Sequence, residues 1–148
     1  MPTIRASVLE DAALLAPFLR PIDAEECLTG SHSPLEALEL GINTSDKCWT
    51  VVDPDGTILA VFGVRTVQAG LASAWLLMRE EFFKYRRRFV RESFDFIKEM
   101  KAVQPVLFNY IDVRNTKSLK WLQSLGFTAT HLEPEYGKNK LPYYLIVS

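Results

Sequence analysis

Residues 110–127 read Tyr-Ile-Asp-Val-Arg-Asn-Thr-Lys-Ser-Leu-Lys-Trp-Leu-Gln-Ser-Leu-Gly-Phe. Asn115 is well suited to cap a helix that begins at Thr116, because its side-chain oxygen can accept from a first-turn N–H group. Gly126 is a typical residue at the end of a helix, since it tolerates positive φ. The stretch therefore predicts a strand, then a helix over 116–125, then the start of another strand.

Similar patterns on both sides of this stretch predict the remaining elements. The hairpin is the clearest, because Asp55-Gly56 suits a tight turn. Strands are expected at 3–6, 48–52, 57–64, 73–78, 105–113, 127–132 and 141–147, and helices at 10–20, within 23–41 (one or two short helices), at 82–100 and at 116–125. Interleaved strands and helices around an antiparallel hairpin predict an α/β (α+β) fold, with a mixed, mostly antiparallel central sheet and helices on both faces.

Two capping motifs predict where helices begin. Ser7 with Glu10 three residues later matches a capping box. Ser33 is the second expected cap, with Pro34 at the first helical position. Gly41 is expected to end the helix that Ser33 begins.

Composition limits the kind of protein this can be. The 148 residues fit a single domain over 1–148, and a hydrophobic content of 48 % can fill its core. Seventeen basic and 18 acidic residues give a net charge of -1, which argues against a broad nucleic-acid surface. Cys27 and Cys48 are too few for a disulfide scaffold or a four-ligand zinc site, so no metal site is expected and both read as buried thiols.

No targeting or membrane segment is expected. Residues 1–7 lack the basic and apolar regions of a signal peptide. Apolar runs such as 58–62 are far shorter than the roughly 20 residues that span a bilayer. We therefore expect a cytoplasmic protein with no membrane span, and the oligomeric state stays open.

The stretch 110–127 resembles the second conserved motif of the GNAT (GCN5-related N-acetyltransferase) superfamily. The residues at that motif's offsets are Asn115, Ser118, Trp121, Gly126 and Phe127. The expected order of elements also matches the GNAT fold over nearly the whole chain. The resemblance implies an acyl-CoA-dependent N-acetyltransferase that acts on a primary amine.

The resemblance also implies where acetyl-CoA would bind. Its pantetheine would lie between the fourth and fifth strands, beside Leu77 and Met78, and its pyrophosphate at the start of the long helix. The other residues expected at the cofactor are Lys84, Arg86, Arg87, Arg88, Phe89, Asn115 and Trp121. The glycines that let phosphates approach the backbone are missing, because no glycine lies between Leu71 and Lys101. Side-chain cations could replace them.

The proton-donating Tyr of many GNAT enzymes follows the motif Asn by seven residues, and here that position is Leu122. We take Tyr143 as the candidate donor. It is one of several nearby tyrosines, which are equally explained as structural aromatics: Tyr110, Tyr136, Tyr143 and Tyr144.

Asp23, Glu25, Glu26 and His32 lie in the region where the family builds its acceptor site, and we take Glu25 and Glu26 as the candidate general bases. Adjacent helical residues point about 100° apart, so both cannot serve one pocket. Solvated surface charge is the alternative for each.

Residues 75–127 also resemble small GNAT-like proteins of short-tailed phages, including the small internal virion protein of podoviruses. The shared features are the basic helix start, the run 109–116, the Leu-Gly-Phe at 125–127, and Asp46-Lys47-Cys48-Trp49 before the hairpin. This resemblance implies a phage protein in the host cytoplasm or packaged in a virion. Its partner would be a phage or host protein, so a non-enzymatic binding role is the alternative to catalysis.

Overall fold

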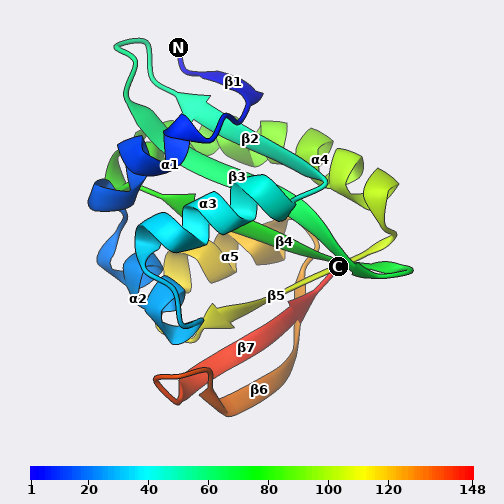
Figure 1. Ribbon diagram of the computed structural model, residues 1–148. Helices are drawn as coiled ribbons and strands as arrows, with labels where there is room; N and C mark the ends of the chain where they lie inside the picture. Colours follow the sequence, from blue (N-terminus) through cyan, green and yellow to red (C-terminus); the bar gives the residue numbers. More distant parts are fainter.

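A seven-stranded sheet crosses the centre of the computed structural model, which describes all residues from 1 to 148 (Figure 1). The strands lie in the order β1-β2-β3-β4-β5-β7-β6, and every neighbouring pair is antiparallel except β4 and β5. Their bounds are β1 (Thr3–Ala6), β2 (Lys47–Val52), β3 (Ile58–Gln68), β4 (Leu71–Met78), β5 (Val106–Asp112), β6 (Thr128–Tyr136) and β7 (Leu141–Val147).

Helices cover both faces of the sheet, as the sequence predicts (Figure 1). We call the face under α1 (Glu10–Leu15), α2 (Pro21–Thr29) and α3 (Pro34–Thr44) the front face. The rear face lies under α4 (Arg86–Val103) and α5 (Thr116–Ser124). Two short 3-10 helices, η1 (Ala16–Phe18) and η2 (Glu80–Tyr85), follow α1 and precede α4.

Each face has its own apolar cluster, because successive side chains of a strand point to opposite faces. On the front, Leu15 and Leu38 of the helices pack with Val61 and Leu77 of the sheet. On the rear, the main cluster includes Met100, Leu125, Leu107 and Ile146. Burying each such side chain contributes about 1.5–3 kcal/mol, so these clusters fix the helices against the sheet.

Several local predictions are confirmed. Asp53 to Gly56 forms the turn of the β2–β3 hairpin, with Gly56 at φ 90°. Ser33 and Glu36 form a complete capping box at the start of α3. Gly126, at φ 97°, follows α5 in the left-handed conformation that favours glycine.

Other boundaries differ from the expected ones. The helix expected over 10–20 becomes α1 and η1, since Pro17 has no N–H to continue the α-helical bonding. Ser7 does not cap α1, because its hydroxyl bonds Thr50 Oγ1 at 2.7 Å. Gly41 does not end α3, which continues to Thr44. Its lack of a side chain instead makes room for Trp75, whose ring would lie 2.7 Å from an added Cβ.

Candidate functional site

β4 and β5 separate along their length and leave a gap in the sheet (Figure 1). They pair only where Leu71, Ala72 and Ser73 lie beside 106–108. Beyond Ser73 the two strands have no paired residues. The gap therefore opens toward the carboxyl ends of both strands, which point the same way because β4 and β5 are parallel.

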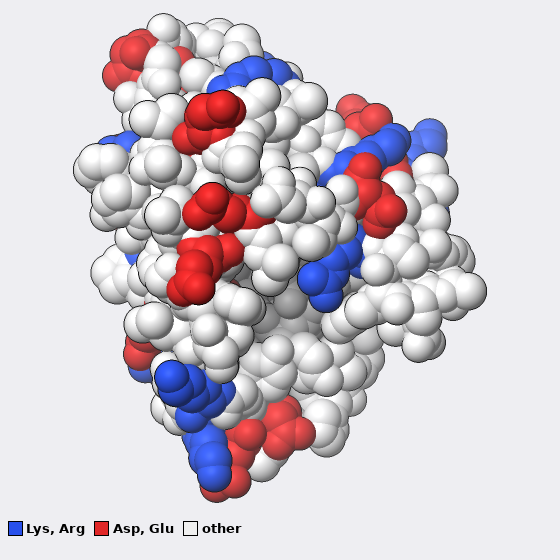
Figure 2. Space-filling view, in the orientation of Figure 1, with Lys and Arg blue, Asp and Glu red and all other residues white.

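Two cavities meet at this gap from opposite faces. The front cavity has a volume of about 310 Å³, and its mouth is visible as the hollow near the middle of Figure 2. The rear cavity, between the strands and helices α4 and α5, has a volume of about 100 Å³. Both cavities are lined by Glu26, Trp75, Leu76, Asn109 and Tyr110. The same five side chains therefore border the gap on both faces of the sheet.

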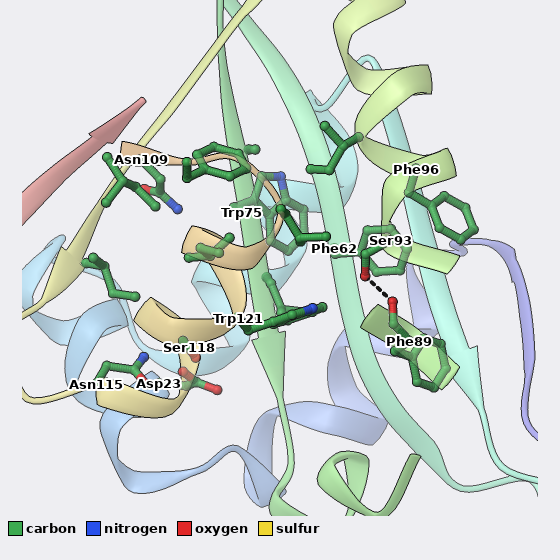
Figure 3. Close-up of a pocket in the computed structure, with 18 of the residues that line it drawn as sticks. Asp23, Phe62, Trp75, Phe89, Ser93, Phe96, Asn109, Asn115, Ser118 and Trp121 are labelled. Carbon is green, nitrogen blue, oxygen red and sulfur yellow. Dashed lines mark hydrogen bonds between the residues drawn. The ribbon is translucent and has the colours of Figure 1, made fainter. Parts of the chain in front are cut away.

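Aromatic side chains fill much of the rear side (Figure 3). The ring of Phe82 lies 4.6 Å from that of Phe89 and 6.1 Å from that of Trp121, between centroids. The indole N–H of Trp121 is buried without a hydrogen-bond partner. The rear cavity is smaller than the roughly 300–1,000 Å³ of ordinary ligand pockets. A ligand that enters it must therefore displace some of these aromatic side chains.

The start of α4 does not form a backbone cradle for phosphate. η2 runs directly into α4, and the N–H of Arg86 donates to the carbonyl of Phe83. Free N–H groups at a helix start are what attract an anion, and here the preceding turn already uses the first of them, that of Arg86. Phe89 is buried against Phe82 rather than exposed at this end.

The four expected cations of this region have different surroundings. Lys84 Nζ lies 3.1 Å from Asp53, which also accepts a 2.6 Å hydrogen bond from Tyr85. The Tyr85 hydroxyl and then Lys84 lower the pKa of Asp53. Arg88 pairs with Glu92 on the next turn at 2.8 Å. Only the remaining two, Arg86 and Arg87, are exposed and without an ion-pair partner.

A buried ion pair closes the carboxyl end of the gap, and sequence analysis did not identify it as part of the site. Arg20 and Asp23 are 2.8 Å apart, and their side chains are 6 % and 1 % exposed. Arg20 also donates to Ser118 Oγ on α5, and Asp23 accepts from the N–H of Met78 on β4. Burial raises the pKa of Asp23 despite the opposing effect of Arg20. The signal in the sequence was the i, i+3 spacing of two opposite charges around Pro21.

The backbone of Met78 shows which way the free edge of β4 faces. The N–H of Met78 donates to the Asp23 carboxylate, and the C=O of Met78 accepts from the N–H of Arg20. Backbone groups of a strand alternate in direction, so those of Leu76 point the same way. Leu77, by contrast, packs its side chain with the front helices, while Met78 is buried on the rear.

Glu26 lies where the two cavities join, and Glu25 does not. The Glu26 carboxylate is 3.4 Å from the amide nitrogen of Asn115. Asn115 stands at the N-cap position of α5 but makes no side-chain capping bond, which differs from the expected role. Burial, and then the negative charge of Asp23, raise the pKa of Glu26 to about 8. Glu25 instead pairs with Arg114 at the surface, 3.1 Å away.

Tyr143 lines the front cavity at the end of a row of three tyrosines. The rings of Tyr110 and Tyr136 stack at 4.5 Å, and Tyr136 lies 4.6 Å from Tyr143. The hydroxyl of Tyr143 is buried without a hydrogen-bond partner, and burial raises its pKa. Leu122, at the position of the family's usual proton donor, lines the rear cavity.

No cluster of three His, Cys, Asp or Glu side chains is placed to hold a metal ion. None of the helices combines the length and apolar character that crossing a membrane requires.

Solved structures similar to this one share its whole architecture. A GCN5-related N-acetyltransferase from Kribbella flavida has a TM-score of 0.70 at 20 % identity, covering 99 % of this chain and 96 % of the other. The fold is that of the GNAT acetyltransferases. The GNAT-like ribosomal-protein-S18-alanine N-acetyltransferase from Escherichia coli gives 0.69 at 14 % identity, covering 99 % and 92 %.

A third GNAT-fold structure, spermidine N-acetyltransferase from Vibrio cholerae in complex with CoA and spermine, gives a TM-score of 0.68 at 12 % identity, covering 99 % and 94 %. No protein-family model and no curated protein sequence matches the chain. The GNAT fold expected from residues 110–127 is therefore confirmed by structure, at identities where sequence comparison finds no match.

Proposed function

We propose that this single GNAT-like domain transfers an acyl group from acyl-CoA to a primary amine. The observation that carries the proposal is the gap between β4 and β5, which has a cavity on each face and Glu26 in the lining of both. Donor and acceptor could then enter from opposite faces and meet beside one carboxylate. The similar Vibrio cholerae enzyme, solved with CoA and spermine, supports this class of reaction.

The gap offers backbone hydrogen-bonding groups to the pantetheine arm of acyl-CoA. The start of α4 offers the pyrophosphate side chains instead of a backbone cradle. The backbone of Leu76 offers the free edge of β4 to the amides of the arm. Arg86 and Arg87 are the exposed cations that would hold the phosphates through their side chains. Acyl-CoA, when bound, supplies the activated carbonyl carbon of its thioester. Because Phe82, Phe89 and Trp121 narrow the rear cavity, we expect the affinity for acyl-CoA to be weak.

Two residues of the chain would carry out the two proton transfers of the reaction. Glu26, when ionised, accepts the proton from the amine held in the front cavity, and Asn115 donates a hydrogen bond that holds the carboxylate in place. Tyr143 keeps its proton across the neutral range, because its pKa is raised, and is the candidate donor to the leaving group.

A second candidate function is non-enzymatic binding of a phage or host protein, in the host cytoplasm or in a virion. The observation that favours it is the aromatic filling of the rear cavity, together with the missing backbone cradle at α4. In that case the half-buried carboxyl of Glu26 would have no catalytic role.

Thermal unfolding with and without acetyl-CoA separates the two candidates. At a concentration ten times the dissociation constant, a ligand adds about 1.4 kcal/mol, which shifts the midpoint by roughly 3–6 °C for a chain of this size. We expect such a shift at millimolar acetyl-CoA. The absence of any shift at that concentration would overturn the acyltransferase proposal and favour the binding protein.

A further inference from the structure

The front cavity carries one positive charge that nothing in the protein neutralises. Arg65 lines this cavity, is exposed, and has no ion pair or hydrogen bond. Asp46 lies beside this part of β3, because its N–H donates to the carbonyl of Val64, but its carboxylate accepts from the N–H of Thr66 at 2.6 Å. An unpaired guanidinium in a cavity is suited to bind a carboxylate or phosphate.

Arg65 and Glu26 lie at opposite ends of the cavity. Arg65 is paired with Ser73 at the amino-terminal part of β4. Glu26 is one helical turn after Asp23, which contacts Met78 at the carboxyl end of β4. Ser73 and Leu77 both line the cavity, and the four residue-to-residue steps from one to the other span about 13 Å. The two charged groups, one at each end, are therefore on the order of 10 Å apart.

The wall between these ends suits an extended organic chain. Tyr110, Tyr136 and Tyr143 form a continuous aromatic surface on one side. Trp75 borders the other side and is held by a 2.8 Å hydrogen bond to Ser45. Such a wall contacts the methylene or peptide part of a ligand while charged groups fix its two ends.

We propose that the front cavity selects amines that carry an anionic group about 10 Å from the reacting nitrogen, with Arg65 binding the anion. The inference rests on the proposed acyl transfer for the role of the amine. A short peptide with a free amino end and a free carboxylate has this chemistry. A polyamine does not, because Arg65 would face a second positive charge.

Triglycine and triglycine amide test the inference, since three extended residues span about 10 Å and the amide differs only in lacking the carboxylate charge. We expect wild-type kcat/KM with acetyl-CoA to favour triglycine by about tenfold. Arg65→Ala should remove this preference by raising KM for triglycine alone. Arg65→Glu should reverse the choice toward spermidine. Lys47→Ala removes an exposed cation that lies outside both cavities, and should change nothing.

Calorimetric titration of both peptides without acetyl-CoA separates this inference from the proposed reaction. If no peptide is acetylated but triglycine binds about tenfold more tightly than its amide, the reaction fails and the anion site stands. Equal binding of the two peptides, or an Arg65→Ala variant that weakens both equally, would overturn the anion site even if acyl transfer occurs.

Discussion

Glu26 is the residue on which the proposed chemistry depends, and its environment explains how one of two adjacent helical glutamates comes to line both cavities. Its helix places it beside Asn115 at the gap, while the adjacent Glu25 reaches Arg114 at the surface. The sequence could predict that these two glutamates diverge, because helix geometry alone requires it. It could not predict which one turns inward, since that depends on where α2 packs.

Burial of Glu26 predicts a pH-dependent penalty on stability. Its pKa rises from 4.5 to about 8 on folding, so the folded protein holds a proton there that the unfolded chain has lost. The free energy of unfolding should therefore fall as pH rises from about 5 to 8, by roughly 3 kcal/mol from this group. Glu26→Gln should remove that fall, as measured by urea unfolding across this range.

Glu25→Gln is the matched control, because Glu25 is partly exposed and paired with Arg114. It should leave the pH dependence unchanged. A Glu26→Gln variant with the same slope as wild type would show that Glu26 is not buried as described.

At the scale of elements, the junction of η2 and α4 determines how the phosphates of an acyl-CoA donor would be held in the proposed reaction. The sequence predicted a long helix over 82–100 but could not show that 80–85 winds as a 3-10 helix into it. That junction uses the N–H of Arg86, the first that a phosphate would meet, and Arg86 and Arg87 are the cations without an ion-pair partner. In the proposed reaction we therefore expect the phosphates of the donor to be held by these two side chains.

The double variant Arg86→Ala/Arg87→Ala should weaken acetyl-CoA binding by roughly tenfold or more in calorimetry, since hydrogen bonds to charged groups are worth about 1.5–3 kcal/mol. Lys98→Ala/Lys101→Ala removes the same charge from the far end of α4 and should have little effect. Equal losses from both variants would indicate only a general effect of charge, and would reject a phosphate site at the start of the helix.

At the scale of the whole molecule, the sheet positions the gap between β4 and β5 and the cavities on its two faces. The stretch 110–127 was enough to predict the strand, the helix and its glycine end, because these depend on residues close in sequence. The separation of β4 from β5, and the two cavities that meet there, arise from packing between distant segments. No local pattern shows them, and neither Arg20 nor Arg65 could have been assigned to the site before the fold placed them.

Amine-dependent release of CoA from acetyl-CoA, followed from pH 6 to 10 for wild type and Glu26→Gln, tests the central claim most directly. We expect the wild-type kcat to rise with pH around a midpoint near 8, as Glu26 loses its proton. Glu26→Gln should lower kcat about 10²- to 10⁴-fold and abolish this rise. Either no amine-dependent release at any pH, or an unchanged rate and pH profile in Glu26→Gln, would contradict the account.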